Sequence, residues 1–158
     1  MEEKRLTVLT QKRCGTMFHQ KTYNLFITDA NVYFVRITKQ DYKEAQQAMD
    51  ASLKGKSFNE RLSLLATNRY ELPPRYHTMS LKDMLEEHVD NFKVTYSDIQ
   101  KIKIKRPKTR DSKGLAKDDY FVIQTTQKKH KVTPASKEEL KRLQEILGDR
   151  VKVPFIIL

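Results

Sequence analysis

The sequence is poor in glycine, cysteine and long apolar runs, and it has no tryptophan. Only four glycines occur among 158 residues, so no glycine-rich loop is present to cradle a phosphate. The single cysteine, Cys14, cannot form a disulfide within the chain, and we therefore expect a reducing, cytoplasmic setting. No apolar run approaches the roughly 20 residues of a membrane-spanning helix, and the opening MEEKRLTVLTQ lacks the pattern of a signal peptide.

Positive charge is what the sequence has in excess. Lysine and arginine number 31 against 20 acidic residues, which gives a net charge of +11. This balance favours an anionic partner such as nucleic acid, acidic lipid or an acidic protein. The alternative interpretation is a solvated, lysine-rich surface without a dedicated ligand. The length indicates one domain, or one domain with a large insertion.

The clearest pattern lies between residues 99 and 105. Ile102 and Ile104 alternate with Lys101, Lys103 and Lys105. A period of two is typical of a half-buried β-strand, with an aliphatic face on the core and a row of lysines in water.

Six other segments are rich in β-branched and aromatic residues and predict further strands, which with residues 99–105 gives about seven in all. The six segments are residues 6–10, 22–28, 32–38, 92–96, 119–126 and 130–133. Residues 12–21 contain Gly15 and no clean period, so we expect a turn or loop there. The strands at 22–28 and 32–38 carry apolar residues on both faces, which we interpret as partial burial in a tightly coiled sheet or barrel.

Helical patterns occupy two places. Between residues 39 and 90, a stripe of Tyr42, Ala45, Met49 and Leu53 and two capped starts, at Ser57 and Ser80, predict a helical insertion whose apolar stripes must lie on something. Near the C-terminus, Ser136-Lys-Glu-Glu139 is a capping box that opens a final helix, which Gly148 ends. The apolar face of this final helix consists of Leu140, Leu143 and Leu147.

This order of elements resembles a pleckstrin-homology-like domain of the bacterial and GRAM type. The segments that carry the resemblance are YNLFITDANVYFV, NFKVTYSDIQKIKIK and DDYFVIQTTQKKHKVTPASKEELKRLQEIL, which together cover roughly two-thirds of the chain. Residues 39–90 depart from the ordinary pattern, although a group of prokaryotic proteins has a similar helical insertion before an NF-x-V/I-x-Y segment.

The resemblance implies a mainly β fold with α-helices. Specifically, it implies a single domain over residues 1–158, with a seven-stranded bent sheet or barrel capped by the C-terminal helix and an insertion at about 39–90. It does not imply a ligand, because the fold hosts lipid-binding, peptide-binding and architectural members.

A candidate binding site lies on the lysine-rich strand, its following loop and the next hairpin. Its residues are Lys101, Lys103, Lys105, Arg106, Lys108, Arg110, Lys128, Lys129 and Lys131. If the two hairpins are neighbours, these charges converge and each adds about 1 kcal/mol toward an anionic membrane. The alternative is that the lysine row only keeps an exposed strand from pairing and aggregating.

We therefore predict a non-enzymatic binding module that contacts an acidic protein or an anionic lipid surface. The alternative is a nucleic-acid-binding protein that uses the same charges, with Tyr96 and Tyr120 as stacking faces, although both tyrosines fit a core pattern better. The region between the first two strands, with Lys12, Arg13 and Lys21, lacks the tight basic-aromatic motif of a specific inositide pocket.

Catalysis, metals and cofactors find little support in the sequence. The histidines match no metal-ligand spacing, and Cys14 with His19 falls short of the four ligands of a structural zinc site. We expect Cys14 to be a buried or idle thiol. The apolar tail, residues 151–158, should pack within the chain or form a homodimer contact.

Overall fold

The computed structural model describes residues 2–16, 18–67, 70–105 and 119–157, and for residues 64–67 it describes the backbone only. The described chain is mainly β with α-helices, as the sequence predicts: eight strands form one mixed sheet, and four α-helices accompany it. The strands are β1 (Arg5–Cys14), β2 (Lys21–Thr28), β3 (Asn31–Arg36), β4 (Phe92–Thr95), β5 (Ile99–Lys105), β6 (Asp119–Thr125), β7 (Lys129–Ala135) and β8 (Phe155–Ile157). The helices are α1 (Lys39–Leu53), α2 (Phe58–Thr67), α3 (Leu81–Glu86) and α4 (Lys137–Gly148), with short 3₁₀ turns η1 (Pro74–His77) and η2 (Tyr96–Asp98).

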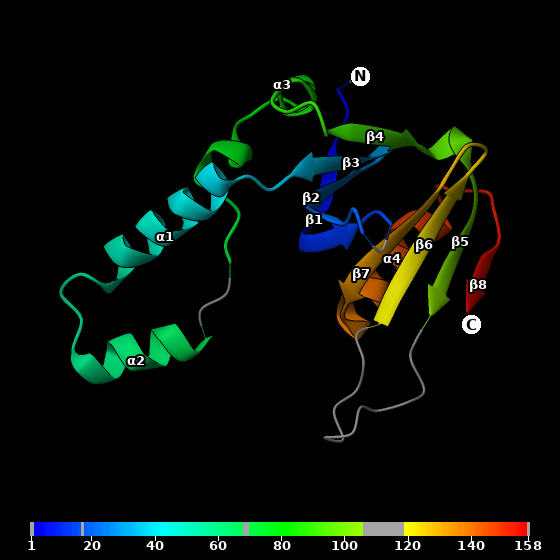
Figure 1. Ribbon diagram of the computed structural model, residues 1–158. Helices are drawn as coiled ribbons and strands as arrows, with labels where there is room; N and C mark the ends of the chain where they lie inside the picture. The colour runs from blue at the N-terminus through cyan, green and yellow to red at the C-terminus, as the bar shows by residue number, and fades with distance from the viewer. Residues whose placement is uncertain (1, 17, 68–69, 106–118, 158) are drawn as a thin grey trace.

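The sheet is bent so that its two halves share one core. Its strand order is β4-β3-β2-β1-β7-β6-β5-β8, which leaves β4 and β8 as the edges. Figure 1 shows β5, β6 and β7 crossing steeply beside β3 and β4. Leu25 and Phe34 of the first half pack in one buried cluster with Ile102, Phe121 and Val132 of the second. Burial of this shared apolar face holds the two halves together.

Strand β1 is longer than its pattern predicts, because a β-bulge interrupts its period. The pairing with β2 slips between Leu9 and Lys12, and Gln11 lies in the left-handed region with φ 54°. The Gln11 backbone N–H donates to the Asn24 side-chain oxygen at 3.3 Å. The extra residue reverses which positions face inward, so Lys12 and Cys14 are buried after the bulge. The loop expected at residues 12–21 is therefore strand as far as Cys14.

The face of β2 and β3 that points away from the shared core is also buried. The sequence suggests coiling of the sheet as the reason, but the structure shows a second layer packed on this face. Phe26, Tyr33 and Val35 form a separate cluster with Tyr76 of η1 and Met84 of α3. The returning part of the insertion thus covers the outer face of these strands. Coiling of the sheet does not explain why both faces are apolar.

The first part of the insertion packs much less. Helices α1 and α2 reach away from the sheet in Figure 1 and form an arm. Phe58 is 74% exposed and Leu62 49% exposed, and Tyr42 is also exposed although its ring meets Tyr70 edge-on at 5.6 Å. The other residues of the predicted α1 stripe, Ala45, Met49 and Leu53, are half-buried. The expectation that the apolar stripes lie on something is therefore wrong for Phe58 and Leu62 of α2 and met only in part on α1.

The C-terminal helix α4 begins at the predicted capping box and lies on the inner side of the sheet. Ser136 Oγ accepts from the Glu139 backbone N–H at 3.1 Å, and Glu139 Oε1 accepts from the Ser136 backbone N–H at 3.0 Å. Its leucines, Leu140, Leu143 and Leu147, are buried in the shared core. In Figure 1 the helix lies behind β6 and β7.

The apolar tail adds a strand that was not predicted. Strand β8 pairs in parallel with β5, with Ile102 opposite Phe155 and Ile104 opposite Ile157. The described sheet therefore has eight strands where the pattern indicates about seven. The expectation that the tail packs within the chain is confirmed.

Candidate functional site: a lysine face on β5, β6 and β7

Five of the predicted site residues lie on one face of the sheet. In the β5–β6 pairing, Lys101, Lys103 and Lys105 stand opposite Gln124, Val122 and Tyr120. In the β6–β7 pairing, Val122 and Gln124 stand opposite Lys131 and Lys129. Residues opposite each other in paired strands project to the same side. We call this set the lysine face: Lys101, Lys103, Lys105, Lys129 and Lys131 around Tyr120, Val122 and Gln124.

The sheet spacing sets the size of this array. Neighbouring strands lie about 4.8 Å apart, so Lys103 on β5 and Lys131 on β7 have backbones about 10 Å apart. Along β5, Lys101 and Lys105 are separated by about 13 Å. The core lies on the opposite side of these strands, where Ile102, Ile104 and Phe121 are buried. The face is therefore directed outward.

The centre of the lysine face is less polar than its borders. Tyr120 is half-buried there, with the Lys131 ammonium 4.2 Å and the Lys105 ammonium 5.9 Å from its ring centre. Val122 is also half-buried, and Gln124 Oε1 is buried without a hydrogen-bond partner among the described residues. The expectation that Tyr120 belongs to the core is wrong, because it lies on the outer side with the lysines.

The positive charge of this face is not balanced locally. Within the described residues, none of the five lysines makes an ion pair with a carboxylate. Lys105, Lys129 and Lys131 are exposed, while Lys101 and Lys103 are half-buried. Lys128 is exposed in the β6–β7 turn. The remaining predicted site residues, Arg106, Lys108 and Arg110, lie outside the described residues.

Two lysines of the loop predicted at residues 12–21, Lys12 in β1 and Lys21 in β2, bind acidic groups of the chain itself. Lys12 points inward and is 4% exposed, with its ammonium 2.6 Å from Glu139 Oε1. Lys21 pairs with Asp90 at 3.0 Å. Both lysines are thus committed to contacts within the chain.

The residues considered for nucleic-acid stacking, for thiol chemistry and for metal binding do not form a site in the described structure. Tyr96 is buried, and its hydroxyl donates to the Thr28 carbonyl, so it offers no stacking face. The Cys14 thiol is buried, as expected, and burial raises its pKa, whereas His19 is exposed. Across the described residues no cluster of three or more His, Cys, Asp or Glu side chains is placed to hold a metal ion.

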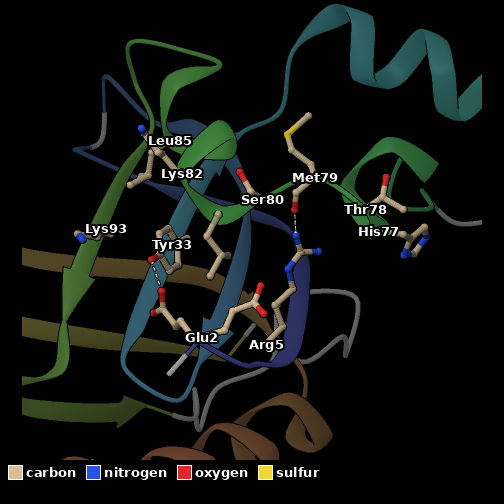
Figure 2. A pocket seen from close by; sticks show the side chains of 12 residues that line it. Glu2, Arg5, Tyr33, His77, Thr78, Met79, Ser80, Lys82, Leu85 and Lys93 are labelled. Carbon is tan, nitrogen blue, oxygen red and sulfur yellow. Dashed lines mark hydrogen bonds between the residues drawn. The ribbon is translucent and has the colours of Figure 1, made fainter.

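A cavity of about 660 Å³ lies between the N-terminal segment, β3, β4 and the η1–α3 segment. Figure 2 shows Arg5 directed toward the Met79 carbonyl, with Tyr33 and Lys93 on the other side. We call it the Arg5 cavity; its lining is Glu2, Glu3, Arg5, Tyr33, His77, Thr78, Met79, Ser80, Leu81, Lys82, Leu85 and Lys93. The sequence does not indicate this cavity, because no local pattern relates residue 5 to residues 76–79.

A smaller hollow of about 270 Å³ lies between β4 and the β6–β7 turn, and His130 lines it. The His130 ring is 7% exposed and lies 5.3 Å from the Phe92 ring. Its Nδ1 has no hydrogen-bond partner in the described structure. Burial and nearby Lys128 lower the pKa of His130, which favours the neutral ring.

Comparisons with known proteins add little to this geometry. No protein-family model matches the chain, and the search of curated proteins gives no match. Among solved structures, the hSac2 domain from the human phosphoinositide phosphatase Sac2 is similar at a TM-score of 0.48 and 10% sequence identity, with 99% of this chain and 78% of that chain covered. No helix in the described part of the chain is long and apolar enough to cross a membrane.

Proposed function

We propose that the chain is a non-enzymatic binding module of the pleckstrin-homology-like type whose lysine face contacts an anionic membrane surface. The observation that carries the proposal is the gathering of Lys101, Lys103, Lys105, Lys129 and Lys131 on one outward face without an acidic partner among the described residues.

The fold supports this class of protein. The support is the order of the elements: seven strands, β1 to β7, precede α4, and the leucines of α4 are buried in the shared core. The added strand β8 lies on β5, at the border of the lysine face. A module of this kind needs no catalytic group, because its action is to bring the rest of an assembly to a surface.

A membrane is favoured over the other anionic partners by the form of the site. Because the lysines stand on paired strands, their charges are spread over an area of about 10 by 13 Å. A layer of acidic headgroups can meet all five charges at once. Nucleic acid is less well matched, since the ring of Tyr120 already has the Lys131 ammonium close to it and Tyr96 is buried.

The expected affinity is modest. At about 1 kcal/mol for each lysine near an acidic membrane, five lysines contribute about 5 kcal/mol, which corresponds to a dissociation constant on the order of 0.1–1 mM. Screening at physiological ionic strength, where the Debye length is about 8 Å, reduces this further. The binding should therefore be reversible and sensitive to salt.

Vesicle sedimentation tests the proposal. We expect the protein to sediment with phosphatidylserine-containing vesicles at 50 mM salt, and to be released at 300 mM salt or when the vesicles contain only phosphatidylcholine. The variant Lys101→Glu/Lys103→Glu/Lys105→Glu should lose binding. The matched control is Lys43→Glu/Lys54→Glu/Lys56→Glu, because it reverses the same number of charges and all three of these lysines are exposed on the arm.

Two results would reject the membrane partner. One is an absence of sedimentation with acidic vesicles at low salt. The other is an equal loss of binding in the control variant, which would show that only net charge matters. Salt-dependent binding to oligonucleotides or to an acidic protein, without binding to vesicles, would assign the lysine face to that partner instead.

A further inference from the structure

The Arg5 cavity contains a half-buried cation whose charge has no acidic partner. The guanidinium of Arg5 donates from Nη1 to the Tyr76 carbonyl and from Nη2 to the Met79 carbonyl, and it lies 5.5 Å from the centre of the Phe26 ring. A guanidinium has five N–H donors, so three remain without a partner among the described residues. No carboxylate lies within ion-pair distance of Arg5 in the described structure.

One nearby acid, Glu3, is already occupied. Its Oε1 accepts from Thr28 Oγ1 at 2.6 Å and from the Asn31 side-chain amide, and its Oε2 accepts from Tyr33 O–H at 2.6 Å. Burial alone would raise the pKa of Glu3, but these bonds outweigh it and hold the pKa below its ordinary value. All three partners of this carboxylate lie on β2 and β3, and none of its printed bonds is made with Arg5. Glu3 therefore does not neutralise Arg5.

The second acid, Glu2, is exposed and makes no hydrogen bond or ion pair within the described chain. It lines the same cavity as Arg5. The negative charge of Glu2 should repel an anionic ligand from the cavity. It does not pair with Arg5 and so does not take the place of such a ligand.

The rest of the cavity combines apolar and positive groups. Met79, Leu81 and Leu85 are half-buried and pack on the cluster beneath the η1–α3 segment. Lys82 is exposed at the border of the cavity and has no ion-pair partner in the described part of the chain. The volume of about 660 Å³ falls in the range of small-molecule sites, roughly 300–1,000 Å³, which typically have apolar walls and a few polar groups that fix orientation.

From this combination we infer that the Arg5 cavity binds a small amphipathic carboxylate, an aliphatic chain that ends in a carboxyl group. The carboxylate lies against the free N–H groups of Arg5, with Lys82 adding attraction at the border. The aliphatic chain lies on Met79, Leu81 and Leu85. A carboxylate matches the guanidinium fork, which can donate to both of its oxygens, and an apolar chain gains from leaving water.

This inference does not depend on the proposed function, because the cavity lies over β3 and β4 and the lysine face lies on β5, β6 and β7. If the protein does not bind vesicles, the inference about the Arg5 cavity still stands. If it does not bind carboxylates, the proposed role of the lysine face still stands.

Titration of the isotope-labelled full chain with sodium octanoate, followed by backbone amide shifts, tests it. We expect saturable shifts at Tyr33 and Lys93 and across residues 79–85. The neutral 1-octanol and the cationic octylammonium carry the same chain, and both should bind at least about fivefold more weakly if the carboxylate meets a cation. Acetate, which lacks the chain, should also bind more weakly.

Surface variants provide the decisive comparison, because removing Arg5 would also remove two bonds to the η1–α3 segment. We expect Glu2→Gln to tighten octanoate binding and Lys82→Glu to weaken it by about fivefold or more. The control variant Lys103→Glu, on the lysine face, should bind octanoate as the parent does.

Three results would overturn the inference. They are octanoate shifts confined to the lysine face, equal affinity for octanoate and octanol, and unchanged affinity in both Glu2→Gln and Lys82→Glu. Arg5→Lys gives an independent check, since it keeps the charge and loses the fork: if it still folds by amide spectrum, its octanoate affinity should fall.

Discussion

The ammonium of Lys12 on β1 lies 2.6 Å from Glu139 Oε1 at the start of α4, and the Lys12 side chain is only 5% exposed. The same carboxylate oxygen accepts from the Ser136 backbone N–H and so completes the capping box of the helix. The Glu139 carboxylate therefore caps the N-terminus of α4 and also neutralises Lys12, which faces inward because of the bulge at Gln11. This joins the first strand of the sheet to its last helix.

Removing Glu139 should cost more than removing Lys12. The change Glu139→Ala leaves an uncompensated buried ammonium and an unfinished cap, and we expect a loss of about 2–4 kcal/mol in the free energy of unfolding. The change Lys12→Met leaves a carboxylate that is 25% exposed and still caps the helix, so we expect a loss of less than about 1 kcal/mol. Urea unfolding of both variants measures the difference. Equal losses would show that the ion pair, rather than the stranded charge, sets the cost.

Elements that depend on local pattern could be predicted from the sequence. The alternation of Ile102 and Ile104 with lysines is enough to place β5, because a half-buried strand repeats every second residue. The Ser136–Glu139 spacing likewise fixes the start of α4, because both halves of the capping box lie within one turn. The outward direction of Lys101, Lys103 and Lys105 follows from the same alternation.

Features that depend on distant parts of the chain could not be predicted. The bulge at Gln11 breaks the period of β1, and the Asn24 side chain that bonds it comes from the next strand. Parallel pairing of β8 with β5 brings residue 155 beside residue 102, and three residues after Pro154 carry too short a pattern to indicate a strand. The Arg5 cavity likewise needs residue 5 to meet residues 76 and 79.

Arg75 joins the arm to the returning part of the insertion. Its guanidinium pairs with Asp41 and Glu44 of α1 and, at 2.6 Å, with Glu87 just after α3. It also lies 4.3 Å from the centre of the Tyr76 ring. Because Asp41 is fully buried, Arg75→Met should leave a carboxylate stranded next to Glu87.

For Arg75→Met we expect a loss of about 2–4 kcal/mol, expressed first as local opening of residues 74–87 rather than of the β5–β7 strands. Hydrogen exchange of backbone amides resolves the two regions. Arg61→Met is the matched control, because Arg61 lies on the exposed arm and bonds only the Lys56 carbonyl among the contacts described. A uniform acceleration of exchange in all strands would contradict a local role for Arg75.

Cys14 should react slowly with thiol reagents in the native state. Its side chain lies in the shared core, and burial raises the pKa of the thiol, which lowers the fraction of reactive thiolate. We expect modification by a disulfide reagent to be at least about a hundredfold slower in the native protein than in urea, limited by opening of the sheet. The control is Phe18→Cys in a Cys14→Ser background, because Phe18 is 87% exposed. Similar native rates for the two thiols would place Cys14 at the surface.

His130 should make the protein less stable in mild acid. Its pKa is lowered in the folded state by burial and by Lys128, whereas the unfolded chain has a value near about 6.5. Between these two values the unfolded chain binds a proton that the folded chain does not, so the free energy of unfolding falls as the pH drops below about 6.5. Replacing His130 with phenylalanine removes this proton and also the unpartnered Nδ1 among Phe34 and Phe92.

We therefore expect the variant His130→Phe to gain more stability over the parent protein at pH 5.5 than at pH 8. Urea unfolding of both proteins at the two pH values measures the difference. An equal gain at both pH values would mean that His130 is protonated as readily in the folded chain as in the unfolded one.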